Sequence, residues 1–224
     1  MDIDKIIENK KARNSRNNRP ISAFVELYQA TDKAFKEVVD LGASIETQET
    51  LIKNHVINIV TAIEVYYRDM LDSVFKMCQP STFEKKLKKL HDRTYKIDDL
   101  VEIYVNKIHP LELIANSHSF QNTNTIDKIF TIIIDKPFLK QIRQLKWRQK
   151  DKPETEAEAT QEDILALQDL FEYRHLLIHN PNKSLKTSIE IIEDQINSAC
   201  GVVMASDFIM SQYLNDNIDP ELKS

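Results

Sequence analysis

The stretch TQETLIKNHVINIVTAIEVYYRDMLDSVFKM, from Thr47 to Met77, indicates the fold class of this chain. Its apolar residues recur every three or four positions along its whole length, which is the period of one face of an α-helix. Pro80 follows and predicts the end of this helix. The same period on either side predicts further helices, at about 21–41, 81–90, 126–134, 138–148, 163–179 and 187–214. We therefore expect an all-α structure, in which residues 97–116 add two shorter helical pieces.

Glycine is scarce, and this excludes several classes of protein. The chain has only Gly42 and Gly201, which leaves no material for a phosphate-binding loop or for the tight turns of a many-stranded sheet. Gly42 is expected to end the helix that precedes it, and Gly201 indicates either a close helix contact or simple tolerance. The run 132–134, three isoleucines, fits a short strand as well as a helix. Dinucleotide-binding and P-loop folds are therefore not expected.

Cysteine usage and hydropathy bear on the compartment. Cys78 and Cys200 fit neither a disulfide framework nor a zinc site, and both are expected to be buried as small apolar residues. The longest apolar runs are too short to span a membrane, and the N-terminal residues contain no apolar signal core. These features predict a soluble cytoplasmic protein with no membrane partner.

The organisation of the chain follows from composition. Residues 1–19 are polar and are expected to be a flexible N-terminus, followed by a single domain over 20–224. This domain is predicted to be an antiparallel bundle of four to five main helices, with a smaller basic helical insertion at about 81–150. An acidic, proline-containing linker is expected at about 151–162. Two capping boxes predict helix starts, one at Ser81 and Glu84 and one at Thr187 and Glu190.

Charge is unevenly distributed. The net charge is −5, but residues 81–150 carry +6 and residues 151–224 carry −10. The basic middle segment would attract a polyanion, although charge segregation of this kind is also found on ordinary solvated surfaces.

The stretch EYRHLLIHNP, residues 172–181, is the strongest candidate for a functional site. An imidazole moves protons near neutral pH, and a guanidinium holds phosphate oxygens in a planar fork. Together, Arg174 and His179 could support phosphodiester chemistry without a metal. The helix should end near His179, because Asn180 precedes Pro181. At a helix C-terminus the dipole favours the protonated imidazole, which suits a general acid.

Other interpretations of this stretch are open. Arg174 could pair with an acidic neighbour while His179 caps its own helix. His175 and His179 share a helix face and could be a metal-ligand pair, but a zinc site would need ligands that the sequence does not identify. Glu172 and His175 form one half of a di-iron motif, yet no other histidine has a glutamate three residues before it. No metal or cofactor is therefore expected.

The run RHLLIHN, from Arg174 to Asn180, resembles the R-x4–6-H motif of HEPN proteins, in which a polar residue such as His175 commonly follows the arginine. The stretch AIEVYYRDML, residues 62–71, is similar to the acidic and aromatic early helix of that family. SFQNTNTI, residues 119–126, followed by Phe130, looks like a segment of abortive-infection-type HEPN proteins. The resemblance covers about residues 45–214.

This resemblance implies a HEPN-like bundle and a metal-independent endoribonuclease, usually a homodimer with two motifs facing a cleft for single-stranded RNA. Arg174 and His179 would be the catalytic pair, and the products would carry 2′,3′-cyclic phosphate ends. His175 would orient the site or the RNA, Asn180 would be an accessory residue, and Glu64 would hold Arg174 or His175. Basic residues of the insertion would contact RNA: Lys85, Lys86, Lys88 and Lys89.

The resemblance also implies a role in bacterial toxin or antiphage defence, with an antitoxin or regulatory protein as a possible partner. One toxin subgroup has a tyrosine two residues after the histidine, where this chain has Pro181. Modification by the nucleotidyltransferase partner of that subgroup is therefore not expected. The alternative function is a non-catalytic HEPN-like module that binds RNA, nucleotide or a partner protein.

Overall fold

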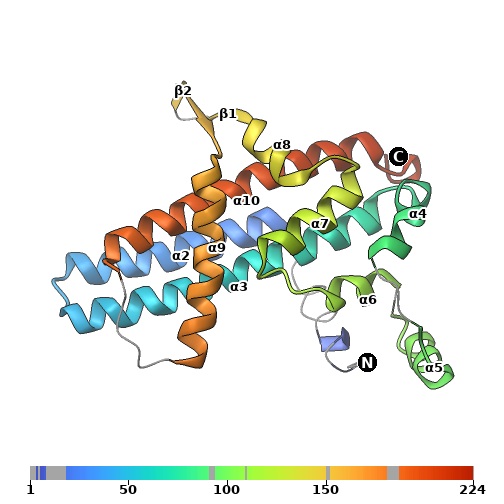
Figure 1. Cartoon of the computed structure of the whole chain (residues 1–224), viewed down its shortest axis with the longest axis horizontal. Helices are drawn as coiled ribbons and strands as arrows, with labels where there is room; N and C mark the ends of the chain where they lie inside the picture. The colour runs from blue at the N-terminus through green and yellow to red at the C-terminus, as the bar shows by residue number, and fades with distance from the viewer. Residues whose placement is uncertain are drawn as a thin grey trace.

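The computed structural model describes residues 4, 6–8, 19–90, 94–108, 110–149, 152–180 and 187–223. Long helices α2 (Pro20–Asp40), α3 (Ile45–Met77) and α10 (Ile189–Asn217) lie side by side, and α9 (Gln161–His179) crosses them (Figure 1). Within the described residues, strand structure is confined to one hairpin and one isolated bridge, so the all-α prediction is confirmed.

The direction of each long helix is fixed at its ends. Gly42, at φ +71°, ends α2 as predicted, because its amide donates to the carbonyl of Val39 (2.9 Å) in a left-handed cap. α2 and α3 are joined by this short turn and run antiparallel, side by side (Figure 1). α10 runs in the same direction as α3, since the amide of Asp219 donates to the carbonyl of Met77 (2.8 Å) where both helices end. A short 3-10 helix, η1 (Pro220–Lys223), follows.

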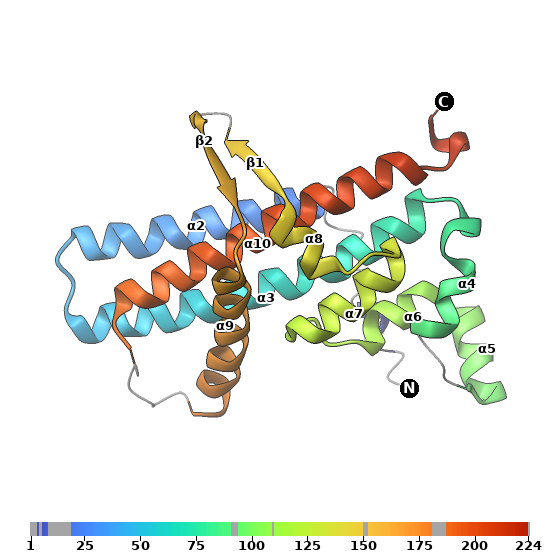
Figure 2. The same ribbon diagram turned by 45° about the horizontal axis from the view of Figure 1, so that its top comes forward.

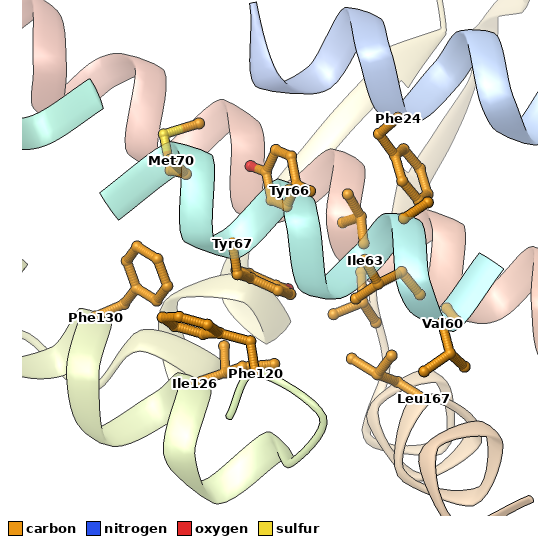
Figure 3. Packing of buried hydrophobic residues seen from close by; sticks show 14 of the residues in the cluster. Phe24, Val60, Ile63, Tyr66, Tyr67, Met70, Phe120, Ile126, Phe130 and Leu167 are labelled. Carbon is orange, nitrogen blue, oxygen red and sulfur yellow. The ribbon is translucent and has the colours of Figure 1, made fainter. Parts of the chain in front are cut away.

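The core is built around the middle of α3. The rings of Tyr67, Phe120 and Phe130 pack against one another, with the Tyr67 centroid 6.4 and 5.6 Å from the other two, and all three side chains are fully buried (Figure 3). Its hydroxyl forms a buried hydrogen bond of 2.9 Å with the hydroxyl of Ser206 on α10. Leu167 brings α9 into the same cluster. The core thus joins α3, α9, α10 and the segment around residues 120–130.

The insertion consists of short helices, as predicted. Ile132–Ile134 are helical rather than a strand, and the first helix of the insertion starts at Pro80, so Ser81 lies inside its first turn. The helices are α4 (Pro80–Leu90), α5 (Ile97–Val105), α6 (Pro110–Ser117), α7 (Thr123–Ile134) and α8 (Phe138–Gln144).

The prediction of a helix to residue 148 and of a linker at 151–162 was wrong. α8 ends at Gln144, and an antiparallel hairpin follows, with β1 (Lys146–Gln149) paired to β2 (Lys152–Glu158). The ammonium of Lys146 bridges to the carboxylates of Glu156 (3.1 Å) and Glu158 (3.8 Å), while Trp147 packs against the core. Cross-strand pairs of this kind stabilise a sheet, but they do not produce a repeating apolar pattern along so short a stretch of sequence.

Helix α5 exposes an apolar stripe. Five apolar side chains at the spacing i, i+3, i+4, i+7 and i+8 lie on one face, and each is at least 48% exposed. Contiguous exposed apolar surface of this kind usually marks an interaction site. We call this set the α5 stripe: Ile97, Leu100, Val101, Tyr104 and Val105.

Part of the expected flexible N-terminus is packed. Most of residues 1–19 fall outside the described residues, but Ile6 is only 5% exposed and packs against Ile108 and Leu113. Residues 182–184, where Asn, Lys and Ser predict a turn before the last helix, also lie outside the described residues. No helix in the described part of the chain is long and apolar enough to cross a membrane.

Details of α10 and of the two cysteines refine the predictions. Ser188, not Thr187, caps α10 by accepting a hydrogen bond from the amide of Ile191. A Cβ atom at Gly201 would meet no atom within 4 Å, so this glycine reflects tolerance rather than a close helix contact. Cys78 and Cys200 are buried free thiols, as expected.

Candidate functional site

Helix α9 carries the candidate site at its C-terminal end. Its start is fixed by a capping box, in which Thr160 and Asp163 bond to each other's backbone amides. The helix is regular to His179, and the amide of Asn180 closes it on the carbonyl of Leu176 (2.9 Å), which confirms the predicted end. The last turns extend beyond the long helices (Figures 1 and 2).

The side chain of Arg174 points toward the inside of the molecule. Its Nη1 donates to the side-chain oxygen of Gln121 (2.8 Å). The side-chain amide of Gln121 in turn donates to one carboxylate oxygen of Glu64 on α3. The other oxygen of Glu64 accepts from Nη2 of Arg68 (2.8 Å). We call these four side chains the arginine network.

Each member of the arginine network is held by its own element. Glu64 and Arg68 are one helical turn apart on α3, with side chains only 18% and 19% exposed. Gln121 directly follows Phe120, which is fully buried, and directly precedes Asn122, which caps α7. A core anchor on one side and a helix cap on the other therefore fix the position from which Gln121 reaches Arg174.

The two histidines lie together on the outside. The rings of His175 and His179 are 4.4 Å apart, and both side chains are exposed. The predicted shared face of the helix is confirmed. Five residues turn a regular helix by about 500°, so Arg174 and His179 point roughly 140° apart. Within the described residues no hydrogen bond or ion pair joins Arg174 to His179, and the chain does not bring them together by itself.

The arginine network has excess positive charge. It contains two guanidinium groups and one carboxylate, and the Nε atoms of Arg174 and Arg68 are buried without a hydrogen-bond partner in the described residues. Guanidinium groups in this state favour an anion such as a phosphate. No group of three metal-binding side chains occurs among the described residues, so His175 and His179 gain no third ligand there.

The lysines of α4 lie elsewhere. Lys85, Lys88 and Lys89 are exposed, but the ammonium of Lys86 bonds to the carbonyl of Ile133 (2.6 Å) and to Asp135 (2.6 Å) and ties α4 to the end of α7. α4 follows the C-terminal end of α3 (Figure 1). Glu64 lies more than three helical turns before that end, about 20 Å at the usual rise of an α-helix. These lysines are not neighbours of Arg174 in one chain.

Two residues of the network were not predicted as site residues. Gln121 lies in the segment that resembles abortive-infection-type HEPN proteins, but nothing in its own type or spacing distinguishes it from the polar residues beside it. Arg68 is four residues after Glu64, a spacing that usually signals only a surface ion pair. Glu64 was predicted to hold Arg174 or His175, and it contacts Arg174 only through Gln121.

Comparison with known proteins identifies the family of the chain. A search of curated proteins and a search of solved structures each found no match. The family model RiboL-PSP-HEPN matches residues 7–210, which is most of the 224-residue chain and includes the whole arginine network and both histidines. The chain therefore belongs to the RiboL-PSP-HEPN family.

Proposed function

We propose that this protein is a metal-independent endoribonuclease that cuts single-stranded RNA. The observation that carries the proposal is the end of α9, where Arg174 is oriented by Gln121 and an exposed pair, His175 and His179, follows within the next five residues. Membership of a HEPN family supports an RNA-related function. A fixed guanidinium beside accessible imidazoles is a suitable arrangement for phosphodiester cleavage.

The chemistry needs only groups that the chain supplies. The 2′-hydroxyl oxygen of the RNA attacks the adjacent phosphorus, so that the O2′–P bond forms while the P–O5′ bond breaks. An imidazole of His179 takes the proton of the 2′-hydroxyl, and a second imidazole gives a proton to the departing O5′. Arg174 stabilises the charge that develops on the phosphoryl oxygens. The products are a 2′,3′-cyclic phosphate and a 5′-hydroxyl.

A second copy of the chain is part of the proposal. Arg174 and His179 point to different sides of α9, so one chain alone does not place both on one phosphate. In a two-fold dimer that brings the ends of two α9 helices together, each phosphate would meet Arg174 of one chain and His179 of the partner subunit. His175 of the partner subunit lies beside that His179, as the 4.4 Å between the two rings within one chain shows, and it then supplies the second imidazole as the general acid. Asn180 would line the same cleft as an accessory residue.

The α5 stripe supports this dimer. Helix α5, which carries the stripe, lies on the same lower side of the molecule as the free end of α9 in Figures 1 and 2, farther along the long axis. The stripe exposes on the order of 500 Å² of apolar surface, near the upper end of the largest patches on ordinary monomers. Two stripes packed together would bury about 1,000 Å², close to the minimum for a stable interface. We therefore assign the stripe to contact with a second copy.

The exposed lysines of α4 would extend the RNA-binding surface of such a dimer. Lys85, Lys88 and Lys89 could contact phosphates outside the cleft, which would make RNA affinity fall with rising salt. We also propose a role in bacterial toxin or antiphage defence, with a regulatory partner protein that restrains cleavage. This part rests on the resemblance of residues 119–126 to abortive-infection-type HEPN proteins.

The test is cleavage of end-labelled single-stranded RNA in EDTA, with product ends assayed for cyclic phosphate. The wild-type protein should cut, and His179→Ala should lower the rate by about 10²–10⁴. Glu172→Gln is the matched control, because Glu172 is an exposed residue of the same helix outside the arginine network. A requirement for Mg²⁺, or full activity of His179→Ala, would overturn the mechanism. RNA binding without any cleavage would favour the non-catalytic module.

A further inference from the structure

A polar pocket lies between α2, α3 and α10, the helices that run side by side in Figure 2. Its volume is about 200 Å³. None of its residues belongs to the arginine network or to the end of α9, so it is separate from the proposed ribonuclease site. Its polar lining includes Asp32, Lys36, His55, Glu190, Glu193 and Asp194.

His55 is the unusual member of this pocket. It is only 5% exposed, and neither ring nitrogen has a hydrogen-bond partner in the described residues. The backbone of Thr31 lies close to the ring of His55 but forms no hydrogen bond with it. The ring of Phe35 packs edge-on against the imidazole, with the two centroids 6.3 Å apart. Burial lowers the pKa of His55, which keeps the ring neutral with one N–H and one free lone pair. Buried polar groups are normally paired, so this lone pair calls for a donor.

The charges around His55 determine what kind of donor fits. Lys36 is paired with Asp32 (2.8 Å), whereas Glu190, Glu193 and Asp194 form no ion pair within the described part of the chain. Burial raises the pKa of Glu193, and Asp32 and the acidic residues of α10 add to this rise against the opposing charge of Lys36. Burial and Asp32 likewise raise the pKa of the Cys200 thiol to about 12. The pocket is therefore strongly negative, and it favours a cation.

A metal ion is not the cation that this pocket fits. Among the described residues, no three imidazole, carboxylate or thiol groups lie close enough together to bind one. The acceptors are instead spread over three helices. A ligand that carries several N–H donors on a short chain can reach carboxylates on α2 and α10 and the lone pair of His55 together.

We propose that the pocket between α2, α3 and α10 binds a small organic cation with primary ammonium groups. The ammonium donates to the neutral ring of His55 and to the carboxylates of Asp32 and Glu193, while Glu190 and Asp194 attract the remaining positive charge at the mouth. This site is independent of the proposed ribonuclease activity.

The experiment is titration calorimetry of the full-length protein with putrescine, a diamine, and with tetramethylammonium, which has the charge but no N–H donor. Putrescine should bind at millimolar or lower concentration, and tetramethylammonium should bind much more weakly. Glu193→Gln and His55→Phe should each weaken putrescine binding roughly tenfold or more, the usual effect of removing a hydrogen bond to a charged group. Glu46→Gln, which removes an exposed carboxylate of α3 outside the pocket, should change it little.

Near-ultraviolet circular dichroism checks that His55→Phe is folded. If His55→Phe does not fold, the Glu193→Gln variant still tests the site. The proposal is overturned if putrescine does not bind, if tetramethylammonium binds equally well, or if Glu46→Gln is as damaging as Glu193→Gln. Each of these results would mean that the pocket holds only water or that binding is a general effect of surface charge.

Discussion

Arg174 on α9 donates a 2.8 Å hydrogen bond to Gln121, a residue 53 positions earlier in the chain. The orientation of the proposed catalytic arginine is therefore set by the segment before α7 and, through Gln121, by Glu64 on α3. Helix α9 itself fixes only the position of the Arg174 backbone. This relationship makes Gln121 a positioning residue rather than a catalytic one.

Gln121→Leu should lower the cleavage rate by roughly ten- to a hundredfold, because a misplaced catalytic group costs about that much. The measurement is kcat and KM on one RNA, with the loss expected mainly in kcat. In an Arg174→Ala background the same change should have little further effect, since residues that act as a unit are not additive. Gln144→Leu, at an exposed glutamine at the end of α8, is the control. Full additivity of the two changes would contradict this role.

Arg174→Lys should also abolish most of the activity. Lysine keeps the positive charge but loses the planar fork, so it cannot bond to Gln121 and a phosphoryl oxygen in the same geometry. The single-turnover rate in EDTA measures this, and we expect a loss of roughly a hundredfold or more. Arg143→Lys, an exposed arginine in the last turn of α8, should leave the rate unchanged. Wild-type cleavage by the lysine variant would show that charge alone suffices.

The α5 stripe gives a prediction about assembly. Val101→Asp introduces a charge in the middle of the stripe and should convert the proposed dimer to a monomer, as measured by light scattering at micromolar concentration. If the cleft needs two chains, cleavage should fall in parallel. Glu102→Gln removes an existing charge beside the stripe and should leave the dimer intact. A Val101→Asp protein that remains dimeric would assign the stripe to another partner.

The partly buried carboxyl group of Asp207 leads to a prediction about how the free energy of unfolding changes with pH. Burial raises its pKa, and Tyr66 donates a hydrogen bond to it (3.3 Å). The carboxyl group of Asp207 therefore holds its proton more tightly in the folded state than in the unfolded state. The free energy of unfolding should fall as the pH rises from the pKa of this group in the unfolded state to its higher pKa in the folded state. Asp207→Asn keeps an acceptor for Tyr66 and should be more stable than the wild type near pH 7, but not near pH 4.

Urea unfolding at these two pH values is the measurement for Asp207→Asn. The exposed carboxylate of Glu84 on α4 provides the control, and Glu84→Gln should show no such difference between the two conditions. Equal effects of Asp207→Asn at both pH values would mean that the Asp207 carboxyl is not the group responsible.

The helices could be predicted from the sequence because their apolar period is a local property. The end of α9 at His179 and the shared face of His175 and His179 follow from the same local geometry. The hairpin could not be predicted, since it depends on pairing between Lys146 and residues 156–158. Gln121 was missed for a similar reason: its role arises only when a loop meets α3 and α9, and no spacing along the chain records that contact.

The junction of Phe120 and Gln121 has a genetic consequence. Phe120 is fully buried against Tyr67, and the next residue holds the proposed catalytic arginine. Replacing such a buried aromatic ring by alanine typically costs about 3–5 kcal/mol, and here it would also release Gln121. In a selection for loss-of-function alleles, mutations should therefore accumulate at codon 120 as well as in the motif, although the two are separated by more than fifty codons.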